Sequence, residues 1–106
     1  MPKYLFQGRF TNQGAKGLAE RGGKDRVKAV QDLAKSAGGK LESYYFAFGD
    51  IDYFIIFDLP DNASAAAIAL AVAASGSVNN KTTVLMTPQE IDEAAKQHPS
   101  YRPPGA

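Results

Sequence analysis

The chain has 106 residues, with twelve Lys and Arg against eleven Asp and Glu, and a formal net charge of +1. This length suits one small domain, and a charge so close to zero excludes the broad positive field that recruits nucleic acid or an anionic membrane. There is no cysteine and only one histidine, His98, which excludes disulfides, thiolate metal sites, a cysteine nucleophile and a multi-histidine metal site within one chain.

The expected location is the cytoplasm, and no part of the chain is expected to enter a membrane. The absence of cysteine suits a reducing compartment, and Met1–Phe6 runs directly into polar sequence without the longer apolar core of a signal peptide. The longest stretch without charge, residues 62–80, is rich in alanine and is interrupted by Ser75-Gly76-Ser77. It therefore falls short of the roughly 20 apolar residues that a membrane span requires.

The first part of the chain predicts a strand, a loop and a helix. Aromatic and polar positions alternate with period two over residues 3–10, which predicts a strand. Its two faces carry Tyr4, Phe6 and Phe10, and Leu5, Gln7 and Arg9, respectively. Four glycines interrupt residues 11–23, so we expect a loop or a short helical turn there. From Lys24 an apolar stripe at helical spacing predicts the main helix, which Gly38-Gly39 ends.

The remainder predicts a hairpin, a helix, a strand and a last short helix. Residues 40–48 and 53–59 form an expected antiparallel hairpin around the turn Gly49–Asp52. A helix over residues 63–75 and a fourth strand over residues 79–86 follow. Thr87–Glu90 is a capping-box pattern with proline at the first helical position, which predicts a helix through Gln97.

This order of elements predicts an α+β fold, the ferredoxin-like split βαββαβ arrangement, with a four-stranded antiparallel sheet plus a short C-terminal helix. We expect one ferredoxin-like domain over residues 1–97 and a Pro-rich extended tail over residues 98–106. Right-handed crossovers place both main helices on one face of the sheet. Because residues 53–57 are apolar on both faces of their strand, the other face also needs a cover. The sequence therefore predicts a homodimer or higher homo-oligomer in which two sheets pack face to face.

Many short blocks, in order along nearly the whole chain, resemble the GYD domain family. They are Met1–Tyr4, Gly14–Leu18, Gly22-Gly23, Gly38–Lys40, Tyr45–Gly49, Asp58–Asn62, Ala74–Gly76 and Lys81–Leu85. The resemblance implies a ferredoxin-like fold related to the dimeric α+β barrels, and it implies no established reaction or cofactor. The family takes its name from a Gly-x-Tyr-Asp turn. Here Gly49 and Asp52 match that turn, but Ile51 stands in the tyrosine place, so a role for a phenol hydroxyl is not expected there.

Two polar clusters have both a chemical and a structural interpretation. Asp50 and Asp52 are spaced to serve a hard cation or general acid–base chemistry, but they also suit a hairpin turn through side-chain bonds to backbone N–H groups, the favoured reading. The run Arg21–Arg26 combines basic residues with Gly22-Gly23 at the start of the main helix, where backbone N–H groups bind anions. The glycines also serve simply to turn the chain, which is the favoured reading.

Aromatic residues and the single histidine are also open to two readings. The aromatic strands resemble a surface that stacks single-stranded RNA, but near-zero charge and the lack of a basic glycine-aromatic motif favour core and dimer packing. His98 suits a helix C-terminus, where a cation meets the helix dipole, and is a proton-transfer group only if the tail folds over a pocket.

Two hypotheses for function follow. The first is a small-molecule-binding homo-oligomer of the dimeric α+β barrel type, with cofactor-independent enzymes among its fold relatives. The second is a non-catalytic regulatory or scaffold oligomer that acts through protein contacts, with the tail docking on its own or another subunit. We expect no cofactor, no metal, no nucleic acid partner and no membrane partner. The candidate ligand-binding residues are Arg9, Lys16, Arg26, Tyr44, Tyr45, Asp50, Asp52 and Lys81.

Overall fold

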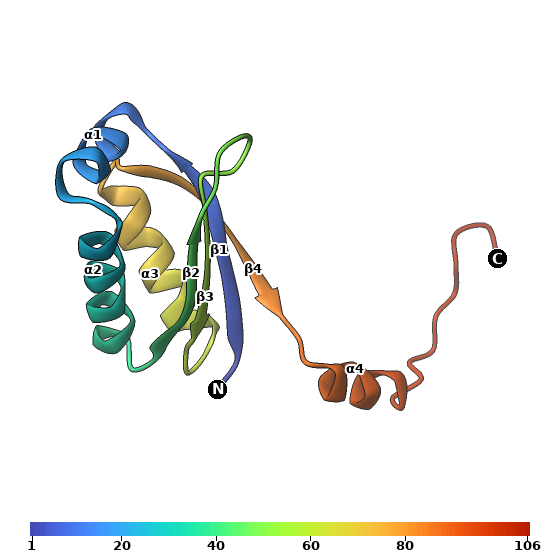
Figure 1. Cartoon of the computed structure of the whole chain (residues 1–106). Coiled ribbons are helices and arrows are strands. Elements are labelled where there is room, and N and C mark those ends of the chain that lie inside the picture. The colour runs from blue at the N-terminus through green and yellow to red at the C-terminus, as the bar shows by residue number, and fades with distance from the viewer.

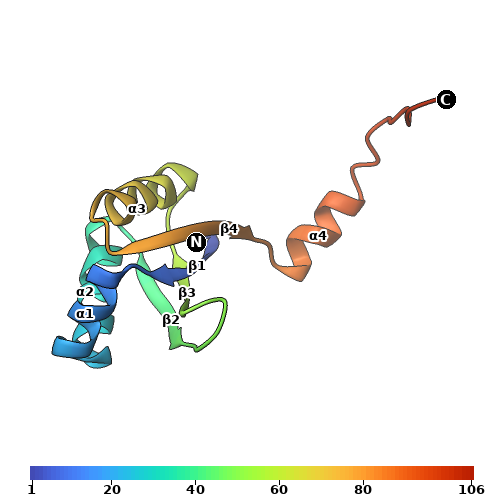
Figure 2. The ribbon, with the colours of Figure 1, turned by 90° about the horizontal axis from the view of Figure 1, so that it is seen from above.

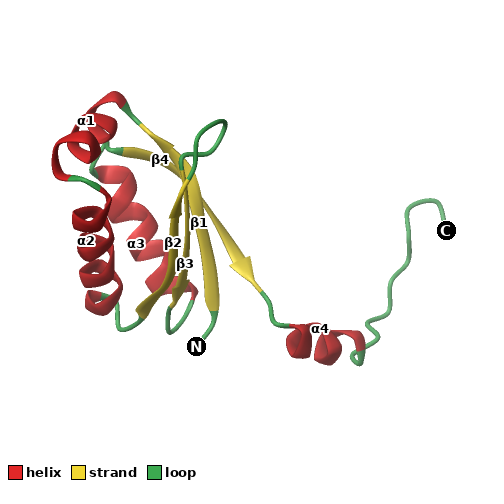
Figure 3. Cartoon of the chain, viewed as in Figure 1, coloured by secondary structure: helices red, strands yellow, loops and turns green.

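The computed structural model describes residues 1–106 and has two layers, a sheet and the helices on one of its faces (Figure 1). The strands form one antiparallel four-stranded sheet in the order β2-β3-β1-β4. Figure 3 shows α1, α2 and α3 on the same side of this sheet. The α+β class with a ferredoxin-like order is therefore confirmed. The elements are β1 Lys3–Phe10, α1 Asn12–Arg21, α2 Gly23–Ser36, β2 Lys40–Phe46, β3 Tyr53–Asp58, α3 Asn62–Ala74, β4 Val78–Leu85 and α4 Pro88–Ala95.

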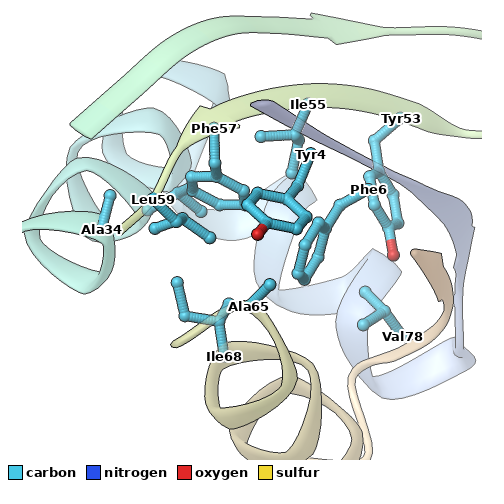
Figure 4. Packing of buried hydrophobic residues seen from close by; sticks show 11 residues of the cluster. Tyr4, Phe6, Ala34, Tyr53, Ile55, Phe57, Leu59, Ala65, Ile68 and Val78 are labelled. Carbon is cyan, nitrogen blue, oxygen red and sulfur yellow. The ribbon is translucent and has the colours of Figure 1, made fainter. Parts of the chain in front are cut away.

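The core lies between the sheet and the helices. Alternation along β1 buries Tyr4 and Phe6, and alternation along β3 buries Tyr53, Ile55 and Phe57. The helices contribute Val30, Ala34, Ala65 and Ile68 to the same cluster, and Figure 4 shows the two α3 residues facing the aromatic rings of the sheet. The apolar residues of the predicted strand and helix patterns thus pack together in one layer between sheet and helices.

The expectation of a loop or short helical turn after β1 is wrong, because residues 12–21 form the ten-residue helix α1. The Thr11 hydroxyl caps it by accepting a hydrogen bond from the Gly14 N–H at 3.2 Å. Gly14 does not break the helix; a Cβ there would lie 2.0 Å from the Ser77 carbonyl oxygen, so glycine lets α1 pack against the turn before β4. The helix ends at Gly22, whose φ of 86° separates α1 from α2.

The predicted hairpin of β2 and β3 is confirmed, and the element ends differ from expectation by one or two residues. β2 stops at Phe46 rather than Phe48, because the Ala47 N–H bonds to the Asp52 carbonyl and closes the loop. The pairing of β2 with β3 also shifts between Leu41 and Ser43. This β-bulge is an irregularity that period two alone does not reveal.

The face of the sheet opposite the helices is uncovered by any part of this chain's folded body (Figure 1). We call it the open sheet face. Tyr45 there is 71% exposed and Phe54 is 37% exposed, so β3 does carry apolar side chains on both faces. Strand register places Leu5, Ile56, Arg9 and Lys81 on the same face. At one end Lys3 joins Asp58 and Glu42 through salt bridges of 2.8 and 2.6 Å.

Residues 86–106 form an arm that leaves the folded body at the end of β4. Every residue of the arm is exposed, and Figures 1 and 2 show α4 well away from the other helices. The radius of gyration is 16.9 Å, against about 13 Å for a compact chain of this length. None of the helices combines the length and the apolar composition that a membrane-spanning segment needs.

Candidate functional site

A surface groove of about 590 Å³ lies between α1 and the first turns of α2, with Phe10 in its wall. The break at Gly22 creates it, because the two short helices meet there at an angle instead of forming one rod. Three cations line it, Lys16, Arg21 and Arg26, together with Glu20 and Asp25. The groove therefore has a locally mixed charge with an excess of one positive group.

A smaller cavity of about 20 Å³ lies deeper, between α2, α3 and the sheet. Phe10 and Arg26 line both the groove and this cavity, so they form the wall that the two spaces share. The cavity is mostly apolar, and its polar lining comes from Arg26, Tyr44, Tyr53 and Asn80. Small-molecule sites usually have about 300–1,000 Å³, so this cavity has room for only about one water molecule, and the groove is the space large enough for a ligand.

Arg26 has an unused donor at this wall. Its Nε atom is buried and has no hydrogen-bond partner. A buried, unpaired donor is costly, and the cost is larger when the group is charged. A ligand acceptor at the shared wall would satisfy this donor.

The two tyrosines of the cavity are held in their neutral form. Burial and, to a smaller extent, the Tyr44 side chain raise the pKa of Tyr53 to about 12, against an opposing effect of the Arg26 guanidinium. Burial likewise raises the pKa of Tyr44, again against the effect of Arg26. The Tyr53 hydroxyl donates to Asn80 Oδ1 at 2.7 Å. At neutral pH both phenols are therefore O–H donors rather than anions.

Taken together, these groups place a guanidinium and two phenols beside an apolar wall. The guanidinium supplies charge-assisted hydrogen bonds, which are stronger than neutral ones. The apolar walls of the inner cavity include Phe6, Val30, Ile55 and Phe57. No covalent chemistry follows from this set by itself; it consists of one charged donor, neutral phenols and apolar side chains.

The structure brings three of the eight candidate residues to this site. Lys16 and Arg26 line the groove, and Arg26 and Tyr44 line the cavity. Tyr45 and Lys81 lie on the open sheet face instead. Arg9 and Asp52 border a separate, more open hollow of about 580 Å³ beside the exposed Phe48 ring.

The paired aspartates of the hairpin turn have different surroundings. Asp52 Oδ2 accepts a hydrogen bond from the Phe10 N–H at 3.0 Å, and the Asp52 N–H donates to the Gly8 carbonyl at 2.8 Å. Asp52 thus fastens the loop to β1. Asp50 is exposed and lines none of these three spaces.

Of the four polar residues that line the inner cavity, two were not among the sequence candidates, Tyr53 and Asn80. The sequence contains a feature that could have identified each of them. Tyr53 shares the buried face of β3 with Ile55 and Phe57, and a buried tyrosine usually needs a partner for its hydroxyl. Asparagine is rare in strands, so Asn80 in β4 is a reasonable partner to test.

Comparison with known proteins gives one result. The family model described as the GYD domain matches residues 4–95. No curated protein and no solved structure matches the chain significantly. The matched residues include the groove, the cavity and all four strands except Lys3, the first residue of β1. The chain therefore belongs to the GYD domain family.

Proposed function

We propose that this GYD domain protein is a small-molecule-binding homo-oligomer of the dimeric α+β barrel type, and that each subunit binds an anionic ligand with an apolar body. The groove between α1 and α2 is the entrance, and the wall formed by Phe10 and Arg26 is the recognition point. The observation that carries the proposal is the buried Arg26 Nε, which has no partner within the chain.

The chemistry of the pocket favours an anion over a neutral molecule. Arg26 adds a fixed positive charge, and Lys16 and Arg21 stand along the entrance. Burial raises the pKa of Tyr44, so its hydroxyl is a neutral donor close to that charge, whereas the Tyr53 hydroxyl already donates to Asn80 Oδ1. A carboxylate accepts hydrogen bonds from both kinds of donor.

Self-association is proposed from the open sheet face. It carries Leu5, Tyr45, Phe54 and Ile56 without a cover from the same chain. Apolar patches of this kind mark interaction surfaces. A second copy presents the same patch, which suits a closed two-fold dimer.

Catalysis without a cofactor would use the same groups. The guanidinium of Arg26 would stabilise negative charge on a bound substrate, and the Tyr44 hydroxyl would donate a hydrogen bond to it. A ligand-binding regulator needs only the first step, binding. Turnover of a bound carboxylate would identify the protein as an enzyme, and binding without turnover would identify it as a ligand-binding regulator.

Calorimetric titration with benzoate tests the ligand proposal. Benzyl alcohol is the matched neutral compound, because it has the same ring and no charge. We expect benzoate to bind and Arg26→Gln to weaken its binding by about tenfold to a hundredfold, the usual effect of losing a charge-assisted hydrogen bond.

The matched control is Lys24→Gln, which removes an exposed charge from the first turn of α2 outside the groove. It should leave benzoate affinity nearly unchanged. Failure of benzoate to bind, or equal binding by the wild-type protein and Arg26→Gln, would contradict an anion site at Arg26.

The alternative is a non-catalytic regulatory or scaffold oligomer. One observation favours it: the whole arm of residues 86–106 is exposed and available for protein contacts. In that case benzoate and benzyl alcohol would both fail to bind, while the protein would still self-associate.

A further inference from the structure

The arm of residues 86–106 contains a helix that buries no side chain against the rest of the chain. Its helix α4 has eight residues, and no residue of that helix is buried. Isolated helices shorter than about 12–15 residues are marginal in water. The capping box of Thr87 and Glu90 helps, but a helix of this length normally depends on packing against another surface.

The arm has an apolar side that suits such packing. Ile91, Ala94 and Ala95 fall on one stripe at helical spacing, and Ile91 is 53% exposed. Met86 stands just before the N-cap, the position from which a residue packs against the fourth residue of a helix, here Ile91. Glu90 and Asp92 flank this stripe, whereas Gln89 and Glu93 lie on the opposite side.

We propose that the arm of each copy packs on the open sheet face of a second copy, in a reciprocal exchange. This inference rests on the self-association proposed above and names what covers the sheet. The apolar stripe of α4 would contact Leu5, Phe54 and Ile56 of the second copy. The two sheets and the two arms would then together close a dimer of the α+β barrel type.

Charge complementarity supports this pairing. On the open sheet face Arg9 and Lys81 take part in no salt bridge, although other cations of the sheet do. Helix α4 carries three acidic residues and no basic one. The acidic groups beside the apolar stripe, Glu90 and Asp92, would therefore face free cations.

The exposed surface of the chain is larger than that of a compact monomer of the same mass. The chain exposes 7346 Å², whereas a compact monomer of 11.3 kDa exposes about 5,700 Å². The excess of about 1,600 Å² is above the roughly 800 Å² that each partner buries in a standard stable complex. Packing of the arm on another body would remove that excess.

The direction of the arm favours a second copy over the arm's own sheet. Only Met86 and Thr87 join β4 to α4. Thr87 is extended, with ψ of 158°, and the following Pro88 disfavours a helical bend at that position. The arm consequently continues away from α1–α3, toward the side where a body on the open sheet face would lie (Figures 1 and 2).

Cross-linking tests the exchange cleanly because the chain has no cysteine. Two full-length variants, Ile91→Cys and Phe54→Cys, are mixed and treated with a short bismaleimide. We expect a two-chain product containing one of each variant. Gln89→Cys replaces Ile91→Cys in the control, and because it lies on the polar side of α4 it should give little product with Phe54→Cys.

The other outcomes overturn the proposal in different ways. A further variant carries Ile91→Cys and Phe54→Cys in the same chain. Cross-linking only within single chains of this double variant would place the arm on its own sheet. No cross-link from a protein that light scattering shows to be dimeric would mean that the sheets meet without the arms, and the proposed self-association would stand. A monomer by light scattering would refute both.

A second pair of variants covers the case in which Phe54→Cys does not fold. Ile91→Lys places a charge in the apolar stripe, and Gln89→Lys places the same charge on the polar side. We expect Ile91→Lys to raise the dimer dissociation constant by at least about tenfold, and Gln89→Lys to change it little. Equal effects of the two substitutions would contradict packing through the stripe.

Discussion

Removal of the Tyr53 hydroxyl by Tyr53→Phe should weaken the fold at pH 7 and matter less at pH 11. The hydroxyl donates to Asn80 Oδ1 at 2.7 Å, and Tyr53 is only 3% exposed. Loss of one buried hydrogen bond costs about 1–2 kcal/mol of unfolding free energy. That cost applies at pH 7, where the phenol is protonated in both the folded and the unfolded chain.

The pH dependence follows from the raised pKa. The phenol of Tyr53 ionises near its usual pKa of 10 in the unfolded chain, but only at about 12 in the folded protein. Between these values the unfolded state loses its proton first, so stability is fully present below pH 10 and falls as the pH rises toward 12. At pH 11 this loss is about 1 kcal/mol for the wild-type protein, and Tyr53→Phe does not suffer it.

Urea unfolding followed by circular dichroism at pH 7 and pH 11 measures this difference. Other titrating groups are common to both proteins and cancel in the comparison. The stability gap between wild type and Tyr53→Phe should shrink by about 1 kcal/mol at the higher pH. Tyr101→Phe is the matched control, because Tyr101 is exposed on the arm. A gap that stays constant or widens with pH would refute a neutral, buried Tyr53.

Two further pairs of substitutions test the local structure around the site. Gly14→Ala should destabilise the protein by about 1–3 kcal/mol because its Cβ would clash with the Ser77 carbonyl. In the same helix, a Cβ at Gly17 meets nothing within 4 Å, so Gly17→Ala should stabilise the protein by up to about 1 kcal/mol. Thermal unfolding measures both changes, and a destabilised Gly17→Ala would contradict this reasoning. Asp52→Ala should cost about 1–2 kcal/mol through its lost bond to a β1 backbone N–H, while Asp50→Ala should be nearly neutral. Equal losses in chemical denaturation would show that Asp52 does not fasten the loop.

Much of the fold was readable from the sequence because its signals are local. Alternation along residues 3–10 and the aromatic run from Tyr53 to Phe57 identify strands and their buried faces. The capping box at Thr87 locates the start of α4 to the residue. Helix α1 was missed because Gly14 is needed for a contact with a carbonyl more than sixty residues away, and no local pattern reports such a contact.

The site was only partly predictable for a similar reason. Arg26 stood out because it belongs to a basic run around Gly22-Gly23 at a helix start, where backbone N–H groups bind anions. Tyr53 and Asn80 meet only because β1 lies between β3 and β4, and that neighbourhood depends on strand order. The shared wall at Arg26 likewise depends on how α2 rests on the sheet, which sequence periodicity does not give.

The most direct test of the central claim is a high-resolution crystal structure of the full-length protein purified from cells, read at Arg26. We expect a small molecule with an acidic group bonded to Arg26 Nε, inside the groove between α1 and α2, in each copy of a homo-oligomer. A structure in which Arg26 Nε bonds only to its own chain or to water, in a monomer whose open sheet face remains uncovered, would contradict the account.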